Sequence, residues 1–180
     1  MIEIPFLLTE ILFAGIWILI RAAVWIARGR IDWKREALLL LMYVNLAVII
    51  RFVFFPMDRV DGRVQPLVFD ASALRSPRIN LIPLVMFMDY DSPRELLLNN
   101  IGNVAMFIPT GIILPILYRK LDSFWKVAAA GAGISLCIEI LQLPFSIRVT
   151  DIDDLWMNTA GVMIGYGIYA LARAGKSRRE

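Results

Sequence analysis

The chain has no histidine and a single cysteine among its 180 residues. Without histidine it cannot form a zinc site with imidazole ligands, a Ser–His–Asp triad or a Cys–His dyad. Cys137 has no second cysteine in the chain with which to form a disulfide, and it lies within an apolar run. Any catalysis would therefore depend on carboxylates, Lys, Arg, Tyr or an oxygen-ligated metal ion. We expect no resident cofactor.

The chain also lacks long hydrophilic stretches. Hydrophobic residues make up 59% of it and the mean hydropathy is +0.67, whereas soluble domains are about 45–50% apolar. Because no hydrophilic block is long enough to fold alone, we expect a single membrane domain over residues 1–180. The net charge of +3 is too small to indicate nucleic acid as a partner. The N-terminus lacks the basic region of a signal peptide, so we expect the first apolar segment to be retained.

Five apolar segments are each long enough to cross a membrane, which takes about 20 residues. They run over residues 5–26, 37–55, 96–118, 126–145 and 154–172. Lipid offers no partners for unpaired backbone groups, so the segments should be helices. The sequence therefore predicts an all-α membrane protein, a bundle of about five transmembrane helices. Two of these helices lie within residues 5–55, and a long loop follows at residues 56–95.

Basic residues are distributed unequally between the two sides of this predicted bundle. Eleven Lys and Arg residues lie in the linkers after the first and third segments and in the C-terminal tail, against six in the two remaining loops. The side richer in Lys and Arg should be cytoplasmic. This rule predicts an outer N-terminus, a cytoplasmic C-terminus, and extracytoplasmic loops at 56–95 and 146–153. The apolar stretch 78–84 is too short to span, and we expect it on the membrane surface or over the helix ends.

Polar side chains within and beside the apolar segments are the main functional signal. Amides and carboxylates in a membrane span are costly, and they usually face the bundle interior and mark a functional site. In the predicted topology these groups all lie near the outer face. The candidate ligand-binding residues are Asn80, Asn99, Asn103, Glu139, Gln142, Arg148, Asp151, Asp154 and Asn158. Glu139 is also the candidate catalytic residue, because a carboxylate in a span should be paired, protonated or hydrated.

Helical spacing directs several of these groups toward other helices. Ser135 and Glu139 lie one turn apart on a single stripe. Gly161 and Gly165 form a small-residue motif that lets another helix approach closely. A purely structural role stays open beside the functional one. Amides in spans often only bond neighbouring helices, and the acidic run at 151–154 could cap a helix N-terminus.

Several short stretches, taken together, resemble the VanZ-like family of bacterial membrane proteins. The matching pieces are Asn80-Leu81-Ile82-Pro83, Asn99-Asn100-Ile101-Gly102-Asn103, Phe107-Ile108-Pro109-Thr110-Gly111, Ile138-Glu139-Ile140-Leu141-Gln142, Arg148-Val149-Thr150-Asp151-Ile152-Asp153-Asp154-Leu155, Asn158-Thr159-Ala160-Gly161 and Gly165-Tyr166. The VanZ-like region covers about residues 78–170. The resemblance implies a multi-pass protein of the bacterial plasma membrane. The founding member is associated with low-level resistance to the glycopeptide teicoplanin, and most members have no settled biochemical activity.

Three functions are compatible with these features. The first is an envelope protein, not evidently catalytic, with an outward polar pocket for a lipid head group or a glycan-bearing envelope molecule. Its partners would be membrane lipids and lipid-linked or glycopeptide molecules, with an influence on teicoplanin susceptibility. The second is an intramembrane lipid-modifying enzyme, with Glu139 as a base and Asp151, Asp153 and Asp154 holding Mg²⁺ or Mn²⁺. The third is a scaffold or a transporter, although transport usually needs a polar path across the midplane.

Overall fold

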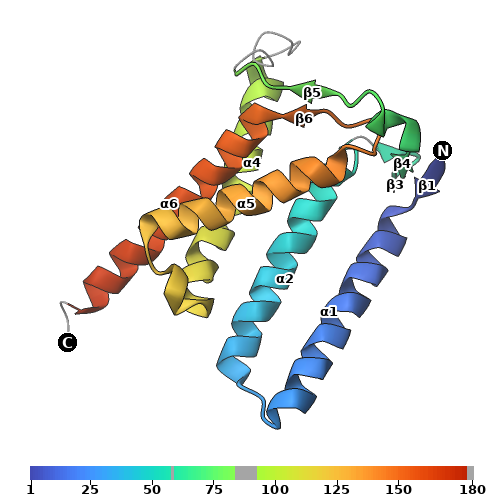
Figure 1. Ribbon diagram of the computed structural model, residues 1–180. Helices are drawn as coiled ribbons and strands as arrows, with labels where there is room; N and C mark the ends of the chain where they lie inside the picture. The colour runs from blue at the N-terminus through green and yellow to red at the C-terminus, as the bar shows by residue number, and fades with distance from the viewer. Residues whose placement is uncertain (58, 84–92, 178–180) are drawn as a thin grey trace. The chain divides into compact units, whose positions relative to one another are not determined.

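The structure is a computed structural model that describes residues 1–57, 59–83 and 93–177. Most of the described residues are helical, which confirms the all-α prediction (Figure 1). The long helices are α1 (Phe6–Arg28), α2 (Trp33–Phe54), α4 (Pro93–Leu117), α5 (Phe124–Gln142) and α6 (Ile152–Ser177). Each corresponds to one of the five predicted segments. Part of the predicted loop at 56–95 lies outside the described residues.

Four of these helices have the length and composition to cross a membrane. They are α1, α2, the part of α4 over Asn99–Leu117, and α5. α6 has 26 residues, but it opens with Asp153 and Asp154 and carries Lys176 in its last turn. It is not among the candidate spans found in the described part of the chain. The chain is thus a multi-pass membrane protein with four candidate spans, and a fifth crossing by α6 stays a prediction.

The chain folds as two compact units. The first comprises Met1–Ser76 and Pro144–Arg148, and the second comprises Pro77–Leu143 and Val149–Glu180. In the first unit, α1 and α2 form an antiparallel hairpin in which the rings of Phe13 and Tyr43 stack 5.0 Å apart. The turn between the two helices begins at Gly29, whose φ of 62° lies in the left-handed region that glycine adopts without strain.

Short strands complete the first unit. β1 (Ile2–Ile4) pairs antiparallel with β4 (Leu67–Phe69), and β2 (Arg59–Val60) pairs with β3 (Arg63–Val64). The 3₁₀ helix η1 (Ala71–Leu74) follows β4. Phe145, from the returning segment of the chain, packs edge-on against Phe54 and Phe69. Aromatic contacts of this kind hold the segment 144–148 to the first unit.

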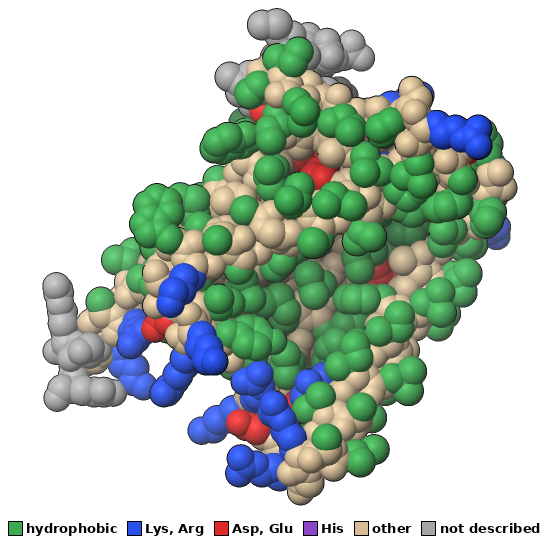
Figure 2. Space-filling model, in the orientation of Figure 1, with side chains coloured by type: hydrophobic (Ala, Val, Ile, Leu, Met, Phe, Trp, Pro, Cys, Tyr) green, Lys and Arg blue, Asp and Glu red, His purple; other side chains and the backbone are tan. Residues whose placement is uncertain are grey.

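The surface of the α1–α2 hairpin is suited to lipid. Large apolar side chains such as Leu7, Leu19 and Leu41 stand exposed along both helices, and Figure 2 shows hydrophobic side chains over much of the visible face. A water-soluble monomer rarely exposes so much contiguous apolar surface. Lys and Arg side chains gather instead at the turn between α1 and α2 (Figure 2).

In the second unit, α6 packs closely on α4 because glycines line the contact. A Cβ atom at Gly161 would collide with the carbonyl oxygen of Val104, and one at Gly165 would collide with that of Ile108. This confirms that the Gly161/Gly165 face is turned toward protein. α4 stays helical through Pro109 and Pro115, and the 3₁₀ helix η2 (Arg119–Leu121) connects α4 to α5.

A parallel pair of two-residue strands lies at the start of α6. β5 (Ile79–Asn80) runs beside β6 (Thr150–Asp151), with Ile79 opposite Thr150 and Asn80 opposite Asp151. The backbone N–H of Thr150 also donates to the carbonyl oxygen of Arg78 at 3.0 Å. The apolar stretch predicted to cover helix ends therefore reaches the N-terminus of α6 through backbone pairing.

Candidate functional site

Glu139 is the centre of a buried polar cluster in the second unit. The residue is only 3% exposed. Its Oε2 accepts a hydrogen bond from the backbone N–H of Asp151 at 3.1 Å, and its carbonyl oxygen accepts one from the Thr150 hydroxyl at 3.1 Å. Among the described residues, its Oε1 has no hydrogen-bond partner. Glu139 is therefore a buried carboxylate with only one of its two oxygens satisfied.

Asp151 joins β5, β6 and α6. Its Oδ1 accepts from the backbone N–H of Asp153 at 2.9 Å, and its Oδ2 accepts from Nδ2 of Asn80 at 3.2 Å. Asn80 in turn accepts from the backbone N–H of Ile82 at 3.1 Å. A carboxylate beside the first turn of a helix is favoured, since the N–H groups there lack partners within the helix. Asp151 thus fixes how the loop strand meets α6.

Two further side-chain pairs connect α6 to α4 and to α5. Nδ2 of Asn103 on α4 donates to Oδ1 of Asp154 at 2.5 Å. Nδ2 of Asn158 donates to the Ser135 hydroxyl on α5 at 2.9 Å. Asn158 is 2% exposed, and its Oδ1 lacks a hydrogen-bond partner in the described part of the chain. Polar side chains therefore bridge α4, α5 and α6.

The charge around Glu139 is negative. The carboxylates of Asp151 and Asp154 both lie within electrostatic range of it. No Lys or Arg of the described residues forms an ion pair with Glu139. Excess negative charge in a buried place attracts hydrogen-bond donors and cations and repels phosphate. The arrangement is thus suited to hydroxyl or ammonium groups.

The structure brings most of the predicted site residues together. Hydrogen bonds connect Asn80, Asn103, Glu139, Asp151, Asp154 and Asn158 with one another or with their immediate neighbours. Gln142 is buried at the last residue of α5, and Asn99 is exposed one turn before Asn103. Arg148 belongs to the first unit, where its Nε donates to the carbonyl oxygen of Phe54 at 2.8 Å. Its part in the cluster stays a prediction.

The role of some buried or part-buried polar residues could not be recognised from the sequence. Thr150 is one threonine in a polar loop, and its bond to Glu139 depends on the path of the chain. Thr110 on α4 is fully buried, as is Ser135. Helical spacing predicted the stripe that holds Ser135, but it could not predict its partner Asn158.

The carboxylates do not form a metal site in the described residues. A magnesium or manganese ion needs several converging oxygen ligands. No group of three or more Asp, Glu, Cys or His side chains within the described ranges is placed to hold an ion. Asp151 uses both oxygens for bonds within the protein, and Asp154 accepts from Asn103. The structure therefore gives the metal-dependent enzyme hypothesis no support.

Comparison with known proteins identifies the family. No solved structure matches the chain. The protein VanZ of Enterococcus faecium is 34% identical over 80 residues, which is 44% of this chain and 49% of the relative. The match thus spans about half the length of that relative. The family model described as VanZ/LLP1 matches residues 39–173, a range that includes α4, α5, most of α6 and every candidate site residue. The chain belongs to the VanZ/LLP1 family.

Proposed function

We propose that the chain is a plasma-membrane protein of bacteria that binds a donor-rich polar head group at the cluster around Glu139. The ligand would be a sugar-bearing or amine-bearing lipid, or another glycan-bearing molecule of the envelope. It would reach the cluster from the outer face. One observation carries the proposal. Two buried acceptors, Oε1 of Glu139 and Oδ1 of Asn158, have no donor among the described residues.

These two oxygens carry a free-energy cost. A buried acceptor without a donor costs about 1–3 kcal/mol, and a charged one costs more. A ligand that supplied hydroxyl or ammonium donors would recover this free energy. The negative charge contributed by Asp151 and Asp154 favours such donors over a phosphate group. The chemistry therefore supports a head group rich in hydroxyls or amines.

The family gives this proposal a cellular setting. The family that the sequence resembles is associated with resistance to teicoplanin, a glycopeptide that acts at the cell surface. The match to the protein VanZ covers about half of that relative. We therefore include an effect of this chain on teicoplanin susceptibility as part of the proposal. A protein that binds glycan-bearing envelope molecules would alter the access of teicoplanin to its surface target.

Two variants test the proposal directly. Glu139→Gln replaces the carboxyl group of the first acceptor with an amide, and Asn158→Ala removes the second acceptor. Each should weaken the retention of a diglucosyl lipid by the purified protein about tenfold, since a charge-assisted or buried hydrogen bond contributes about 1.5 kcal/mol or more. Native mass spectrometry measures the retained lipid, with phosphatidylcholine as the reference. Teicoplanin susceptibility of cells with matched membrane abundance of each variant should shift in parallel.

Thr159→Val is the matched control. Among the residues that the structure describes, the Thr159 hydroxyl bonds only to the carbonyl oxygen of Leu155 within its own helix, at 2.7 Å. The control should therefore retain the glycolipid as the wild type does. If folded Glu139→Gln and Asn158→Ala proteins also bound it like the wild type, the cluster would not be the binding site.

A further inference from the structure

A pocket lies at the turn between α1 and α2, within the first unit. It has a volume of about 560 Å³, and its apolar wall consists of Val24, Trp25 and Ile31. Four charged residues from the same turn complete the lining. The turn precedes residues 39–173, so it lies outside the region that the family model matches. Nothing in the function proposed for the Glu139 cluster uses this pocket.

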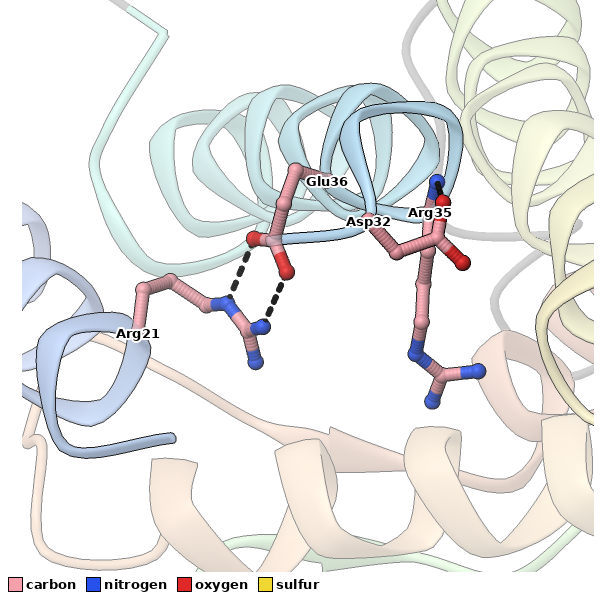
Figure 3. A network of polar contacts seen from close by, with 4 residues as sticks. All are labelled: Arg21, Asp32, Arg35 and Glu36. Carbon is pink, nitrogen blue, oxygen red and sulfur yellow. Dashed lines mark hydrogen bonds and ion pairs between the residues drawn. The ribbon is translucent and has the colours of Figure 1, made fainter. Parts of the chain in front are cut away.

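The carboxylates of the pocket already have partners. Glu36 receives both hydrogen bonds of a two-point ion pair from Arg21, with Nε of Arg21 donating to Oε2 at 2.8 Å and Nη2 donating to Oε1 (Figure 3). Oδ1 of Asp32 accepts from the backbone N–H of Arg35 at 3.2 Å and so caps α2 (Figure 3). The Arg21 guanidinium thus neutralises Glu36 at the pocket wall.

Two guanidinium groups of the pocket have no partner among the described residues. Arg28 and Arg30 both line it and are both exposed. Neither forms a hydrogen bond or an ion pair with any residue that the structure describes. Gly29 stands between them in the left-handed conformation and donates to the carbonyl oxygen of Trp25 at 3.0 Å. A guanidinium presents a planar set of donors that matches the oxygens of a phosphate group.

The position of the turn defines the class of ligand. α1 and α2 each have the length and composition to span a membrane, so the residues that join them lie where the chain leaves the hydrocarbon. Phospholipid phosphates lie at this depth, and tryptophan side chains favour it. The apolar wall suits the adjoining part of an acyl chain. We propose that the α1–α2 turn is a binding site for the phosphate of an anionic phospholipid, held by Arg28 and Arg30.

The full-length protein in detergent provides the test. Titration with phosphatidylglycerol, followed by native mass spectrometry, should show one retained lipid, with phosphatidylcholine bound about tenfold more weakly. The double variant Arg28→Gln/Arg30→Gln should lower the affinity for phosphatidylglycerol about thirtyfold, since each of the two cations near a lipid surface contributes about 1 kcal/mol. A circular dichroism spectrum and a size-exclusion profile like those of the wild type establish that the variant is folded.

The double variant Lys34→Gln/Lys120→Gln is the matched control. It removes the same charge from exposed residues that do not line the pocket, so its affinity for phosphatidylglycerol should be that of the wild type. An equal loss in the control would show general surface attraction and would overturn the proposal. So would displacement of the lipid by inorganic phosphate at a similar concentration, which would identify a site for the free anion. Glu139→Gln should leave this binding unchanged, which separates this proposal from the one made for the cluster.

Discussion

The charged side chains Arg21, Glu36 and Glu139 are satisfied to different degrees by hydrogen bonds within the protein. Arg21 and Glu36 satisfy one another in a two-point ion pair whose side chains are 10% and 11% exposed. Glu139 has a backbone donor for one oxygen and none for the other among the described residues. A fully paired charge is most simply structural, whereas a half-satisfied one leaves room for a ligand.

The need of Glu139 for a partner was predictable from the sequence, because a carboxyl group within an apolar run is a local feature. The sequence could not predict the pairing of Arg21 with Glu36, which depends on how two helices lie side by side.

Breaking the buried ion pair should destabilise the protein. We expect Arg21→Met to lower the free energy of unfolding by about 3 kcal/mol, because it leaves the largely buried side chain of Glu36 without its cation. The double variant Arg21→Met/Glu36→Met should recover most of this loss, since replacing both charges by apolar groups removes the unpaired one. Denaturation of the purified protein in mixed detergent micelles measures these differences.

The control for this prediction is Arg28→Met. Arg28 is exposed, so its replacement should change the stability by about 0.5 kcal/mol or less. An Arg21→Met protein as stable as the control would mean that the ion pair contributes nothing to the hairpin.

The long helices were predictable and the short strands were not. An apolar run of about 20 residues is a strong local signal, and each of the five runs became a helix within a few residues of its predicted bounds. β5 and β6 have two residues each, which is too few for a periodic pattern. Their pairing nevertheless brings Asn80 to Asp151 in the cluster. Asp61-Gly62, with φ angles of 51° and 74°, is a sequence signal for the hairpin of β2 and β3 that the apolar pattern did not include.

The contact between α4 and α6 should be sensitive to single methyl groups. We expect Gly161→Ala and Gly165→Ala each to destabilise the protein by about 1–3 kcal/mol, because the new Cβ would collide with a backbone oxygen of α4 that cannot move independently of its helix. Thermal unfolding in detergent, followed by circular dichroism, measures the shift.

Gly167→Ala on the same helix is the control. A Cβ at Gly167 would meet nothing within 4 Å, and alanine favours the helix over glycine by about 1 kcal/mol. This variant should therefore be as stable as the wild type or more stable. Equal destabilisation at positions 161 and 167 would contradict the close packing of α6 on α4.

At the scale of the whole molecule, the apolar composition predicted a multi-pass membrane protein. The distribution of Lys and Arg predicted that the polar groups of the helices lie near the same face of the membrane. The multi-pass, helical class is confirmed by four helices that can span a membrane. The grouping of site residues succeeded within the second unit, since successive helices with short connections bring neighbouring ends together. Arg148 was also predicted to lie in this cluster; it is part of the first unit, and its place in the cluster stays a prediction. The division into two units depends on contacts between distant parts of the chain, which no local pattern in the sequence contains.

The orientation in the membrane is the prediction on which the proposed ligand depends. The excess of Lys and Arg beside the α1–α2 turn and in the tail predicts that these parts are cytoplasmic. In a Cys137→Ser background, a thiol introduced by Val60→Cys should react with a membrane-impermeant maleimide in intact cells. A thiol introduced by Lys34→Cys should react only after permeabilisation. Both positions are exposed, and Lys34 lies in the first turn of α2 whereas Val60 lies beyond its C-terminal end. Each labelling result therefore serves as the control for the other.

The reverse labelling pattern would have a specific consequence for each proposed site. In the topology predicted from the sequence, the Glu139 cluster would then face the cytoplasm, where glycan-bearing molecules of the outer surface are absent, and the proposed function would fail. The pocket at the α1–α2 turn would lie in the outer leaflet. Its binding of phosphatidylglycerol would still be expected, because the open guanidinium groups of Arg28 and Arg30 and the apolar wall beside them do not depend on the side of the membrane.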